Sequence, residues 1–335
     1  MTKNTTIIFI KVYPSCLFIN DNQKKIKRII KIELIIKIFK KIIIRMRSVE
    51  FYNGVISSQI HFGSYRIKTS EDVTTSVKEA LNVGYRAFDT ASVYKNHAKI
   101  AKTLREYLPE LGLTRRDIWI TSKLAPKDHG EERCEEAIRS ILRDLDTDFL
   151  DLFLIHWPGV QKLEVTDPQN KILRRESWAV LERFYEEGKF RAIGVSNYTR
   201  SHLKELLNHC RVAPHVLQTE LHPHYQQPEL VTFCRLHNIH VQAYSSLGQV
   251  GAESPLFRSA AVLRISEALG VSPAQVLLRW GTQSGYTVMP KSVTPARIRE
   301  NFQLDFDVSE DDMKSLDNIG KDVSEKYAWN PESVL

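Results

Sequence analysis

From residue 59 onward, the chain alternates between short runs of β-branched and aromatic residues and longer segments whose apolar residues recur at helical spacing. The short runs predict eight strands, near residues 59–65, 87–89, 118–123, 149–156, 192–196, 216–220, 240–244 and 287–290. The segments between them predict helices that include residues 73–83, 131–145, 177–187, 201–209, 228–237 and 273–283. Helix starts are marked by Ser70-Glu71-Asp72, Ser272-Pro273 and Thr294-Pro295. Eight strands, each followed by a helix, within about 290 residues predict an α/β protein with a (β/α)₈ TIM barrel.

A doubly wound open sheet would show the same alternation of strands and helices. No G-x-G-x-x-G motif follows the first predicted strand, however, which argues against a dinucleotide-binding Rossmann domain. Ahead of the barrel, Asn53-Gly54 separates two short runs at residues 49–52 and 55–56, and this dipeptide is typical of a tight turn between antiparallel strands. We therefore expect a short N-terminal β-hairpin and then the barrel, both within one domain over residues 46–335.

Residues 1–45 differ from the rest of the chain, because they contain fourteen Ile and nine Lys but no Gly and no Ala. Lysines interrupt every apolar run before it reaches the roughly 18 residues of a membrane span. The segment also lacks the unbroken apolar run and the small-residue cleavage site of a secretory signal. Three interpretations remain open: a basic amphipathic helix at a membrane surface, a mitochondrial presequence, or translated upstream sequence ahead of a start at Met46. The composition favours the last one, so we treat residues 1–45 as a non-domain extension, disordered or not native.

The net charge of +7 is not spread evenly along the chain. Residues 1–47 carry nine Lys and three Arg against Asp21 and Glu33, a local balance of +10, so the remaining residues carry −3. A mildly acidic body does not predict a nucleic-acid partner. The four cysteines form no C-x-x-C pair and have no zinc-site spacing, which is typical of reduced thiols in a cytoplasmic protein.

Polar residues stand where the predicted strands end. Along the chain these residues are Asp89, Lys123, His156, Ser196-Asn197, Gln218, Tyr244 and Lys291-Ser292. In a TIM barrel, the carboxyl ends of the strands form the active-site face. A single polar residue at a strand end has an ordinary structural explanation. Polar residues at seven of the eight strand ends indicate a ring of functional side chains around the barrel mouth.

Several segments resemble the signatures of the aldo-keto reductases. They are residues 84–94 (GYRAFDTASVY), 120–124 (ITSKL), 154–158 (LIHWP), 194–198 (GVSNY) and 290–292 (PKS), the last followed by Arg297, Glu300 and Asn301. The resemblance runs from about residue 49 to residue 335 in the order and spacing of the family. It implies an NADP-dependent oxidoreductase that reduces aldehydes or ketones to alcohols.

The resemblance assigns Asp89, Tyr94, Lys123 and His156 to a catalytic tetrad. Carbonyl reduction needs a proton for the oxygen, and a nearby ammonium favours the ionised form of a phenol, which is otherwise a weak acid. Lys123 would supply that ammonium, Asp89 would hold Lys123 by an ion pair, and His156 would hydrogen-bond the carbonyl oxygen. We therefore predict that Tyr94 is the general acid.

The resemblance also implies the cofactor contacts. Ser196, Asn197 and Gln218 resemble the residues that hold the nicotinamide carboxamide, and Tyr244 resembles the aromatic residue that stacks on the ring. A basic cluster resembles the site for the adenosine 2′-phosphate; it comprises Lys291, Ser292 and Arg297, with Asn301 beside them. A phosphate beside Lys and Arg gains charge-assisted hydrogen bonds that NADH cannot offer, so we expect NADPH to be preferred.

Candidates for the walls of the substrate site are Tyr65, Trp157 and Trp329, together with His156. The loop after the seventh strand and the C-terminal tail are short, which in this family favours small aldehydes, dicarbonyls and simple ketones. The alternative function is a slow NADP-binding barrel that acts as a regulatory or structural subunit, and the intact tetrad argues against it. We expect a monomer with a small carbonyl substrate, no nucleic-acid partner and no membrane span.

Two histidine features remain. His97 stands three residues after Tyr94, where family members commonly have Glu, and we expect altered helix capping or pH sensitivity there with little effect on the chemistry. His222 and His224 form an H-x-H pair after the sixth strand, but a zinc site would need further ligands. A metal-dependent hydrolase would place His and Asp ligands at several strand ends, where this chain has Lys, Tyr, Gln and Asn. We predict no metal site.

Overall fold

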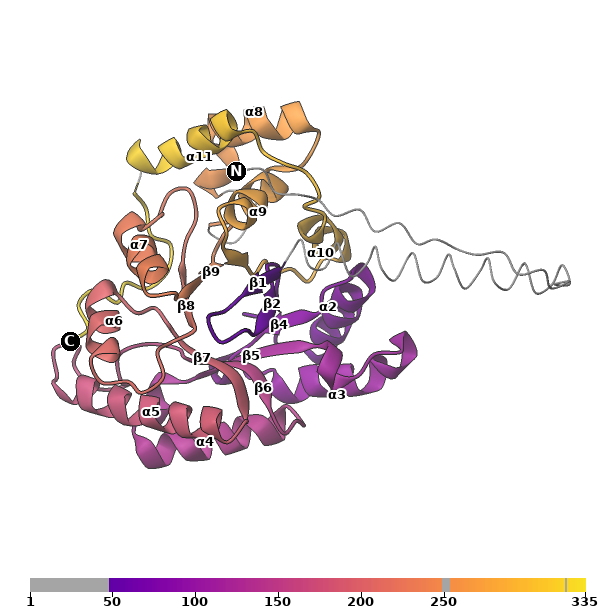
Figure 1. Cartoon of the computed structure of the whole chain (residues 1–335). Helices are drawn as coiled ribbons and strands as arrows, with labels where there is room; N and C mark the ends of the chain where they lie inside the picture. The colour runs from indigo at the N-terminus through magenta and orange to yellow at the C-terminus, as the bar shows by residue number, and fades with distance from the viewer. Residues whose placement is uncertain (1–47, 249–253, 323) are drawn as a thin grey trace, which may run out of the picture. The chain divides into compact units, whose positions relative to one another are not determined.

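The computed structural model describes residues 48–248, 254–322 and 324–335. At its centre is an eight-stranded parallel sheet in the order β10-β9-β8-β7-β6-β5-β4-β3, surrounded by helices in Figure 1. The strands are β3 (Phe62–Gly63), β4 (Ala87–Asp89), β5 (Trp119–Leu124), β6 (Leu150–Ile155), β7 (Phe190–Ser196), β8 (Val216–Glu220), β9 (His240–Tyr244) and β10 (Thr287–Val288). Each strand pairs with the next one along the chain, as consecutive strand–helix units require.

The first and last strands close this sheet into a barrel. Val288 N donates a hydrogen bond to Gln59 O, and His61 N donates to Val288 O, both at 2.9 Å. Gly63 N then donates to Pro290 O at 3.0 Å. Glycine is needed at this close approach, because a Cβ on residue 63 would stand 2.7 Å from the carbonyl oxygen of Met289. The predicted (β/α)₈ barrel is confirmed.

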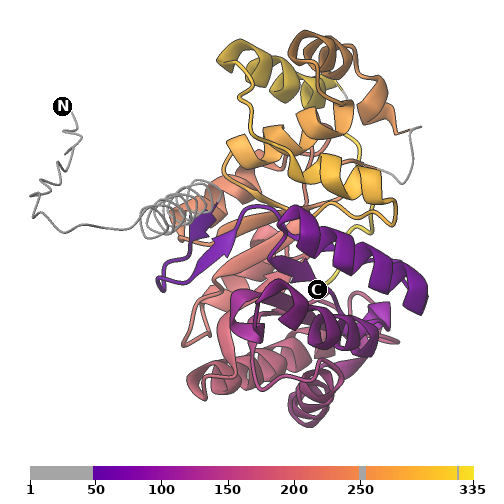
Figure 2. The ribbon, with the colours of Figure 1, turned by 90° about the vertical axis from the view of Figure 1, so that its right-hand side faces the viewer.

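Helices cover the outside of the barrel in both views (Figures 1 and 2). They are α2 (Ser70–Val83), α3 (His97–Tyr107), α4 (Glu131–Asp144), α5 (Gln169–Glu186), α6 (Arg200–Leu207), α7 (Pro228–Leu236), α8 (Ala260–Leu269), α9 (Pro273–Gln283), α10 (Pro295–Phe302) and α11 (Glu310–Asp322). Short 3₁₀ turns lie at Ser92–Tyr94, Pro109–Leu111, Arg115–Asp117, Pro126–Asp128 and Pro255–Arg258.

Side chains alternate along each strand between the barrel interior and the layer of helices. In β6, Leu152 and Leu154 belong to an interior cluster that also contains Trp119 of β5. Phe153 and Ile155, which come between and after them, pack in the large outer core. This alternation decides which of the polar residues at the strand ends point into the barrel mouth.

A β-hairpin of β1 (Ser48–Glu50) and β2 (Ile56–Ser58) lies across one end of the barrel, as the indigo ribbon in Figure 2 shows. The predicted hairpin is confirmed, although its strands are displaced from the predicted runs because residues 51–55 form the connection. Phe51 in this connection is buried and packs edge-to-face on Trp119, with ring centroids 5.9 Å apart. The hairpin therefore closes the end of the barrel opposite to the strand carboxyl ends.

The sequence pattern places most elements correctly but misses some helices and one cap. It does not predict α8 and α11, and for α3 it indicates only a helix start at His97. The N-cap of α3, Asn96, makes no capping hydrogen bond through its side chain. The predicted cap of α2 at Ser70 is wrong. The cap is Thr69, whose hydroxyl accepts from Asp72 N at 3.0 Å, and Ser70 is the first helical residue.

Residues 1–45, which we interpret as an extension, lie outside the described part of the chain. Among the residues that the structure does describe, no single helix is long and apolar enough to cross a membrane. The pair α8 and α9, which is bent by 96°, passes the same test of length and composition.

Candidate active site

Four candidate catalytic side chains meet at the carboxyl ends of the barrel strands. Asp89 is the last residue of β4, Lys123 lies near the end of β5, and His156 directly follows β6. Each is an even number of residues after an interior apolar residue of its strand and so points inward. Tyr94 ends the 3₁₀ turn in the loop after β4, where Lys95 turns the chain with a left-handed φ of 57°. The structure thus brings the four predicted residues together.

Lys123 is at the centre of this group. Its Nζ is fully buried and donates hydrogen bonds to Asp89 Oδ1 at 2.5 Å and to Thr90 O at 3.1 Å. Tyr94 Oη lies 3.5 Å from the same nitrogen. Burial lowers the pKa of Lys123, and the carboxylate of Asp89 opposes that shift. The ion pair therefore holds a positive charge beside the phenol in a region that water does not screen.

The ring of Tyr94 packs between two other rings. It meets His156 edge-to-face with centroids 5.8 Å apart, and it meets Tyr65 at 5.1 Å. Burial raises the pKa of Tyr94 well above its ordinary value, and the charge of Asp89 adds to the shift. The pKa of Tyr94 is therefore raised overall, whereas the positive charge of Lys123 alone would lower it. The phenol therefore carries its proton at neutral pH.

His156 is neutral in this environment. Burial, and then the charge of Lys123, lower its pKa to about 3. A neutral imidazole has one N–H and one acceptor nitrogen. Nδ1 is buried without a hydrogen-bond partner among the described residues. In buried positions, an N–H group without a partner is rarer than an acceptor without one. We therefore assign the proton to Nε2, which can then donate to a ligand at the mouth.

Three of the predicted cofactor residues are joined to His156 by hydrogen bonds. Asn197, which has a left-handed φ of 63°, donates through Nδ2 to His156 O at 2.9 Å and to Ser196 Oγ at 3.1 Å. Tyr244 Oη donates to Asn197 Oδ1 at 2.7 Å. The structure therefore gathers Ser196, Asn197 and Tyr244 on the His156 side of the mouth.

Gln218 lies on the Asp89 side. Its Nε2 donates to Asp89 Oδ2 at 2.8 Å and to Gln242 Oε1 at 3.1 Å. Asp89 thus shares its two oxygens between Lys123 and Gln218. Sequence reasoning missed Gln242, although the signal was present: it stands two residues before Tyr244 in β9, and so on the same inward face.

Four more predicted residues follow β10, namely Lys291, Ser292, Arg297 and Asn301. Ser292 Oγ accepts from Thr294 N at 3.0 Å and so shapes the turn into α10, whose first turn has no acidic residue. Lys291 and Arg297 are exposed, and Arg297 forms no ion pair within residues 48–248, 254–322 and 324–335. Two cations beside a helix N-terminus make this corner suited to an anion.

Aromatic side chains border the mouth next to Tyr94 and His156. Tyr65 is 47% exposed, and Trp157 directly follows His156. Trp157 packs edge-to-face on Trp329, with centroids 6.3 Å apart. The predicted wall residues therefore lie at the mouth, and Trp329 reaches it from the C-terminal segment, residues 326–335, which we call the strap.

Glu220 anchors the beginning of the strap, and sequence reasoning did not identify this role. Its carboxylate, fully buried at the end of β8, accepts from Lys326 Nζ at 2.9 Å, Tyr327 N at 2.5 Å and Ala328 N at 2.9 Å. Burial by itself would raise the pKa of Glu220, but hydrogen bonds from His222 and Lys326 lower it to about 2.

The far end of the strap is also fixed. Val334 O is hydrogen-bonded to His202 Nε2 at 2.8 Å, and Leu335 N donates to Val165 O at 2.7 Å. Arg174 donates to Leu335 O. The strap is therefore held at both ends, with Trp329 between the two anchor points.

His97 and His222 have structural partners in the fold. His97 Nε2 is hydrogen-bonded to Ser122 Oγ at 3.0 Å; burial, and then Lys123, lower its pKa to about 4, so the expected pH sensitivity would lie well below neutral pH. His222 Nε2 is hydrogen-bonded to Glu220 Oε1 at 3.0 Å. In the described part of the chain, no three His, Cys, Asp or Glu side chains are grouped as metal ligands would be.

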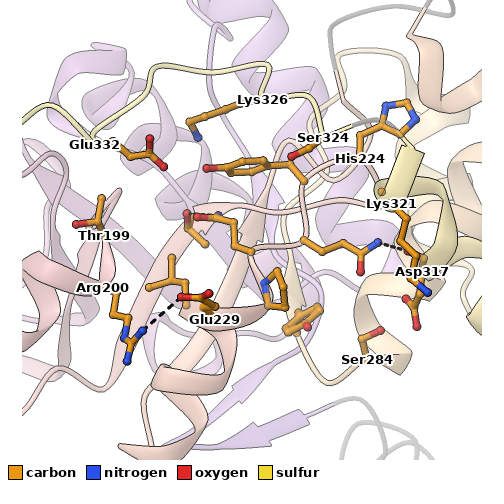
Figure 3. Close-up of a pocket in the computed structure, with 18 of the residues that line it drawn as sticks. Thr199, Arg200, His224, Glu229, Ser284, Asp317, Lys321, Ser324, Lys326 and Glu332 are labelled. Atoms are coloured by element: carbon orange, nitrogen blue, oxygen red, sulfur yellow. Dashed lines mark hydrogen bonds and ion pairs between the residues drawn. The ribbon is translucent and has the colours of Figure 1, made fainter.

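A groove of about 1200 Å³ lies outside the barrel, between α7, α9, α11 and the strap (Figure 3). Its lining mixes charges, and Arg200 and Glu229 form an ion pair across 3.3 Å there. Thr219 lines the groove, whereas its neighbours Gln218 and Glu220 in β8 point the other way. None of the four candidate catalytic residues lines it, so the groove is separate from the mouth.

The structure thus places Asp, Lys, Tyr and His side chains at the mouth of a closed parallel barrel, beside two amides and a second tyrosine. The chain belongs to the aldo/keto reductase family, whose model matches residues 59–321. Members of this family generally depend on a nicotinamide cofactor.

Relatives of the chain are named reductases. It is 37% identical over 275 residues to 9,11-endoperoxide prostaglandin H2 reductase of Trypanosoma cruzi (strain CL Brener). The matched region covers 82% of this chain and 92% of that protein. It is also 37% identical over 289 residues to glyoxal reductase of Bacillus subtilis (strain 168), covering 86% and 97%. The crystal structure of an aldo/keto reductase from Brucella melitensis is similar, with a TM-score of 0.73, 36% identity, and 81% and 98% coverage.

Proposed function

We propose that this protein reduces aldehydes and ketones to alcohols with NADPH, and that Tyr94 is the proton donor. One observation carries the proposal: a buried Lys123 Nζ lies 2.5 Å from Asp89 Oδ1 and 3.5 Å from Tyr94 Oη. A cation held by a carboxylate and touching a phenol can stabilise the phenolate that proton donation leaves behind. The arrangement therefore suits a general acid that gives up its proton and is protonated again in each turnover.

In this reaction the carbonyl oxygen of the substrate accepts hydrogen bonds from Tyr94 Oη and His156 Nε2. NADPH, when bound, supplies the hydride that adds to the carbonyl carbon. The O–H bond of Tyr94 breaks as its proton passes to the carbonyl oxygen, and the alcohol forms. The Lys123 ammonium stabilises the resulting phenolate until a proton from water restores the phenol.

The residues present fit NADPH. Both N–H groups of the Gln218 amide are occupied, and its Oε1 has no hydrogen bond among the described residues, so this oxygen is available to accept from a carboxamide. Tyr244 would stack on the nicotinamide ring. Lys291 and Arg297 would bind the 2′-phosphate beside the N-terminus of α10, which supports a preference for NADPH over NADH.

The substrates that we propose are small aldehydes, dicarbonyls and simple ketones. Tyr65 and Trp329 are 47% and 79% exposed, which supports an open site with aromatic walls. The similarity to a glyoxal reductase supports the inclusion of dicarbonyls.

The test is turnover of a panel of small aldehydes, dicarbonyls and simple ketones by the wild type and by Tyr94→Phe. Turnover is measured as the loss of NADPH absorbance. We expect Tyr94→Phe to lower kcat by about 10²- to 10⁴-fold, because the general acid is lost, and to bind NADPH as tightly as the wild type. Tyr107→Phe, in α3 away from the mouth, is the matched control and should turn over normally. NADH should bind more weakly than NADPH.

Each other outcome has a defined meaning. If the wild type binds NADPH but reduces no panel member, the protein is a binding barrel of the regulatory or structural kind. Full activity in Tyr94→Phe would overturn the role of Tyr94. Equal binding of NADH and NADPH would overturn the role of Lys291 and Arg297.

A further inference from the structure

Gln242 is a buried glutamine with an unusual hydrogen-bond balance. It is fully buried in β9, and it pairs directly with Gln218 of β8 in the parallel register. Its Oε1 accepts from Gln218 Nε2 at 3.1 Å, but its own Nε2 has no partner among the described residues. An unpartnered buried N–H destabilises a fold. The side chain therefore does not serve stability alone, and its single hydrogen bond points to Gln218.

The Gln218 amide occupies the position where the candidate cofactor site meets the candidate proton donor. Its two N–H groups are directed at Asp89 Oδ2 and at Gln242 Oε1. The other oxygen of Asp89 accepts from Lys123, which touches Tyr94. A continuous chain of contacts therefore runs from Gln242 to the phenol. Both acceptors favour the same orientation of the Gln218 amide, with the oxygen away from them.

We propose that Gln242 is a positioning residue of the active site, which acts through Gln218 and touches neither cofactor nor substrate. By accepting the second N–H of Gln218, it keeps Gln218 Oε1 available for the nicotinamide carboxamide and keeps the Asp89 carboxylate aligned on Lys123. Without Gln242, the Gln218 side chain has one acceptor instead of two and gains freedom to rotate away from the carboxamide. This inference rests on the proposed function of the site.

A double-variant cycle on NADPH affinity tests the inference. The variants are Gln242→Met, Gln218→Met and the double variant; Met has a similar length and no acceptor oxygen. NADPH titration by fluorescence gives each Kd, and thermal unfolding gives each Tm. We expect Gln242→Met to weaken NADPH binding by about 5- to 10-fold, as loss of one buried hydrogen bond does. In the Gln218→Met background the same change should alter Kd by less than about twofold.

The Tm of Gln242→Met should lie within about 2–4 °C of the wild type, because the substitution also removes an unpartnered N–H. Unchanged NADPH affinity in Gln242→Met would overturn the inference. Equal weakening in both backgrounds would also overturn it, because the effect would then not pass through Gln218. A wild type that binds no NADPH would instead overturn the proposed function, and this inference with it.

Discussion

Lys123 and Asp89 form an ion pair in the barrel interior, with exposed fractions of 0% and 3%. Removing either charge from water is costly, and their attraction offsets that cost only while both charges are present. Such a pair is a weak source of stability compared with apolar residues of the same size. Its value to this protein therefore lies in the charge that it holds next to Tyr94.

Lys123→Met leaves the Asp89 carboxylate buried without its cation, so we expect the free energy of unfolding to fall by about 3–5 kcal/mol. Adding Asp89→Asn removes the uncompensated charge, and this double variant should be more stable than Lys123→Met. Urea unfolding followed by circular dichroism measures both. A Lys123→Met protein as stable as the wild type would show that Lys123 and Asp89 do not form an ion pair in solution.

At the scale of elements, the strap connects parts of the chain that are far apart in sequence. Glu220 and the amide of Tyr327 are separated by 107 positions. The carboxylate holds the strap by charge-assisted hydrogen bonds, which are about twice as strong as neutral ones. The same strand, β8, carries Gln218 toward the cofactor site and Glu220 toward the strap, so the two regions share one rigid support.

Glu220→Gln tests this anchor. The pKa of Glu220 falls from 4.5 to about 2 on folding, so its carboxylate stabilises the fold above pH 4.5, and this contribution is lost as the pH falls toward 2. We expect the variant to lose roughly 3 kcal/mol at neutral pH and to exchange the amide hydrogens of Tyr327 and Ala328 faster. Urea unfolding and hydrogen exchange measure these effects. Glu332→Gln, an exposed change in the same strap, is the control; equal effects in both variants would contradict the anchor.

Sequence patterns predicted those elements that their own residues specify. The bounds of β4, β8 and β9 match because short β-branched or aromatic runs mark each strand, and the polar residues at the strand ends led to Asp89 and Gln218. The Glu220 anchor could not be predicted, since no local period signals a contact across more than a hundred positions. The raised pKa of Tyr94 was also beyond the sequence, because it results from burial by neighbours on other elements.

At the scale of the whole molecule, the fold buries many neutral imidazoles. Burial lowers the pKa to about 3 or about 4 for seven histidines: His61, His97, His129, His156, His202, His215 and His240. Their ordinary pKa is 6.5. Below pH 6.5 the unfolded chain therefore binds more protons than the folded protein. The folded protein is accordingly most stable above pH 6.5, and its free energy of unfolding decreases as the pH falls toward 4.

We expect the free energy of unfolding to decrease between pH 7.5 and pH 5, by up to about 2 kcal/mol for each histidine that stays neutral in the folded protein. Urea unfolding at a series of pH values measures the slope. His61→Asn should reduce the number of protons taken up on unfolding by about one. A free energy that stays constant over this range would mean that the histidines are hydrated in solution.

The position of Trp329 gives the protein an intrinsic optical reporter. Of the five tryptophans, Trp119, Trp178 and Trp280 are buried, and Trp157 is partly covered, whereas Trp329 is 79% exposed. A dissolved quencher such as acrylamide should therefore act first on Trp329, and subtracting the emission of Trp329→Phe isolates its signal. Movements of the strap during substrate entry and alcohol release could then be timed by stopped-flow fluorescence, without attaching a dye.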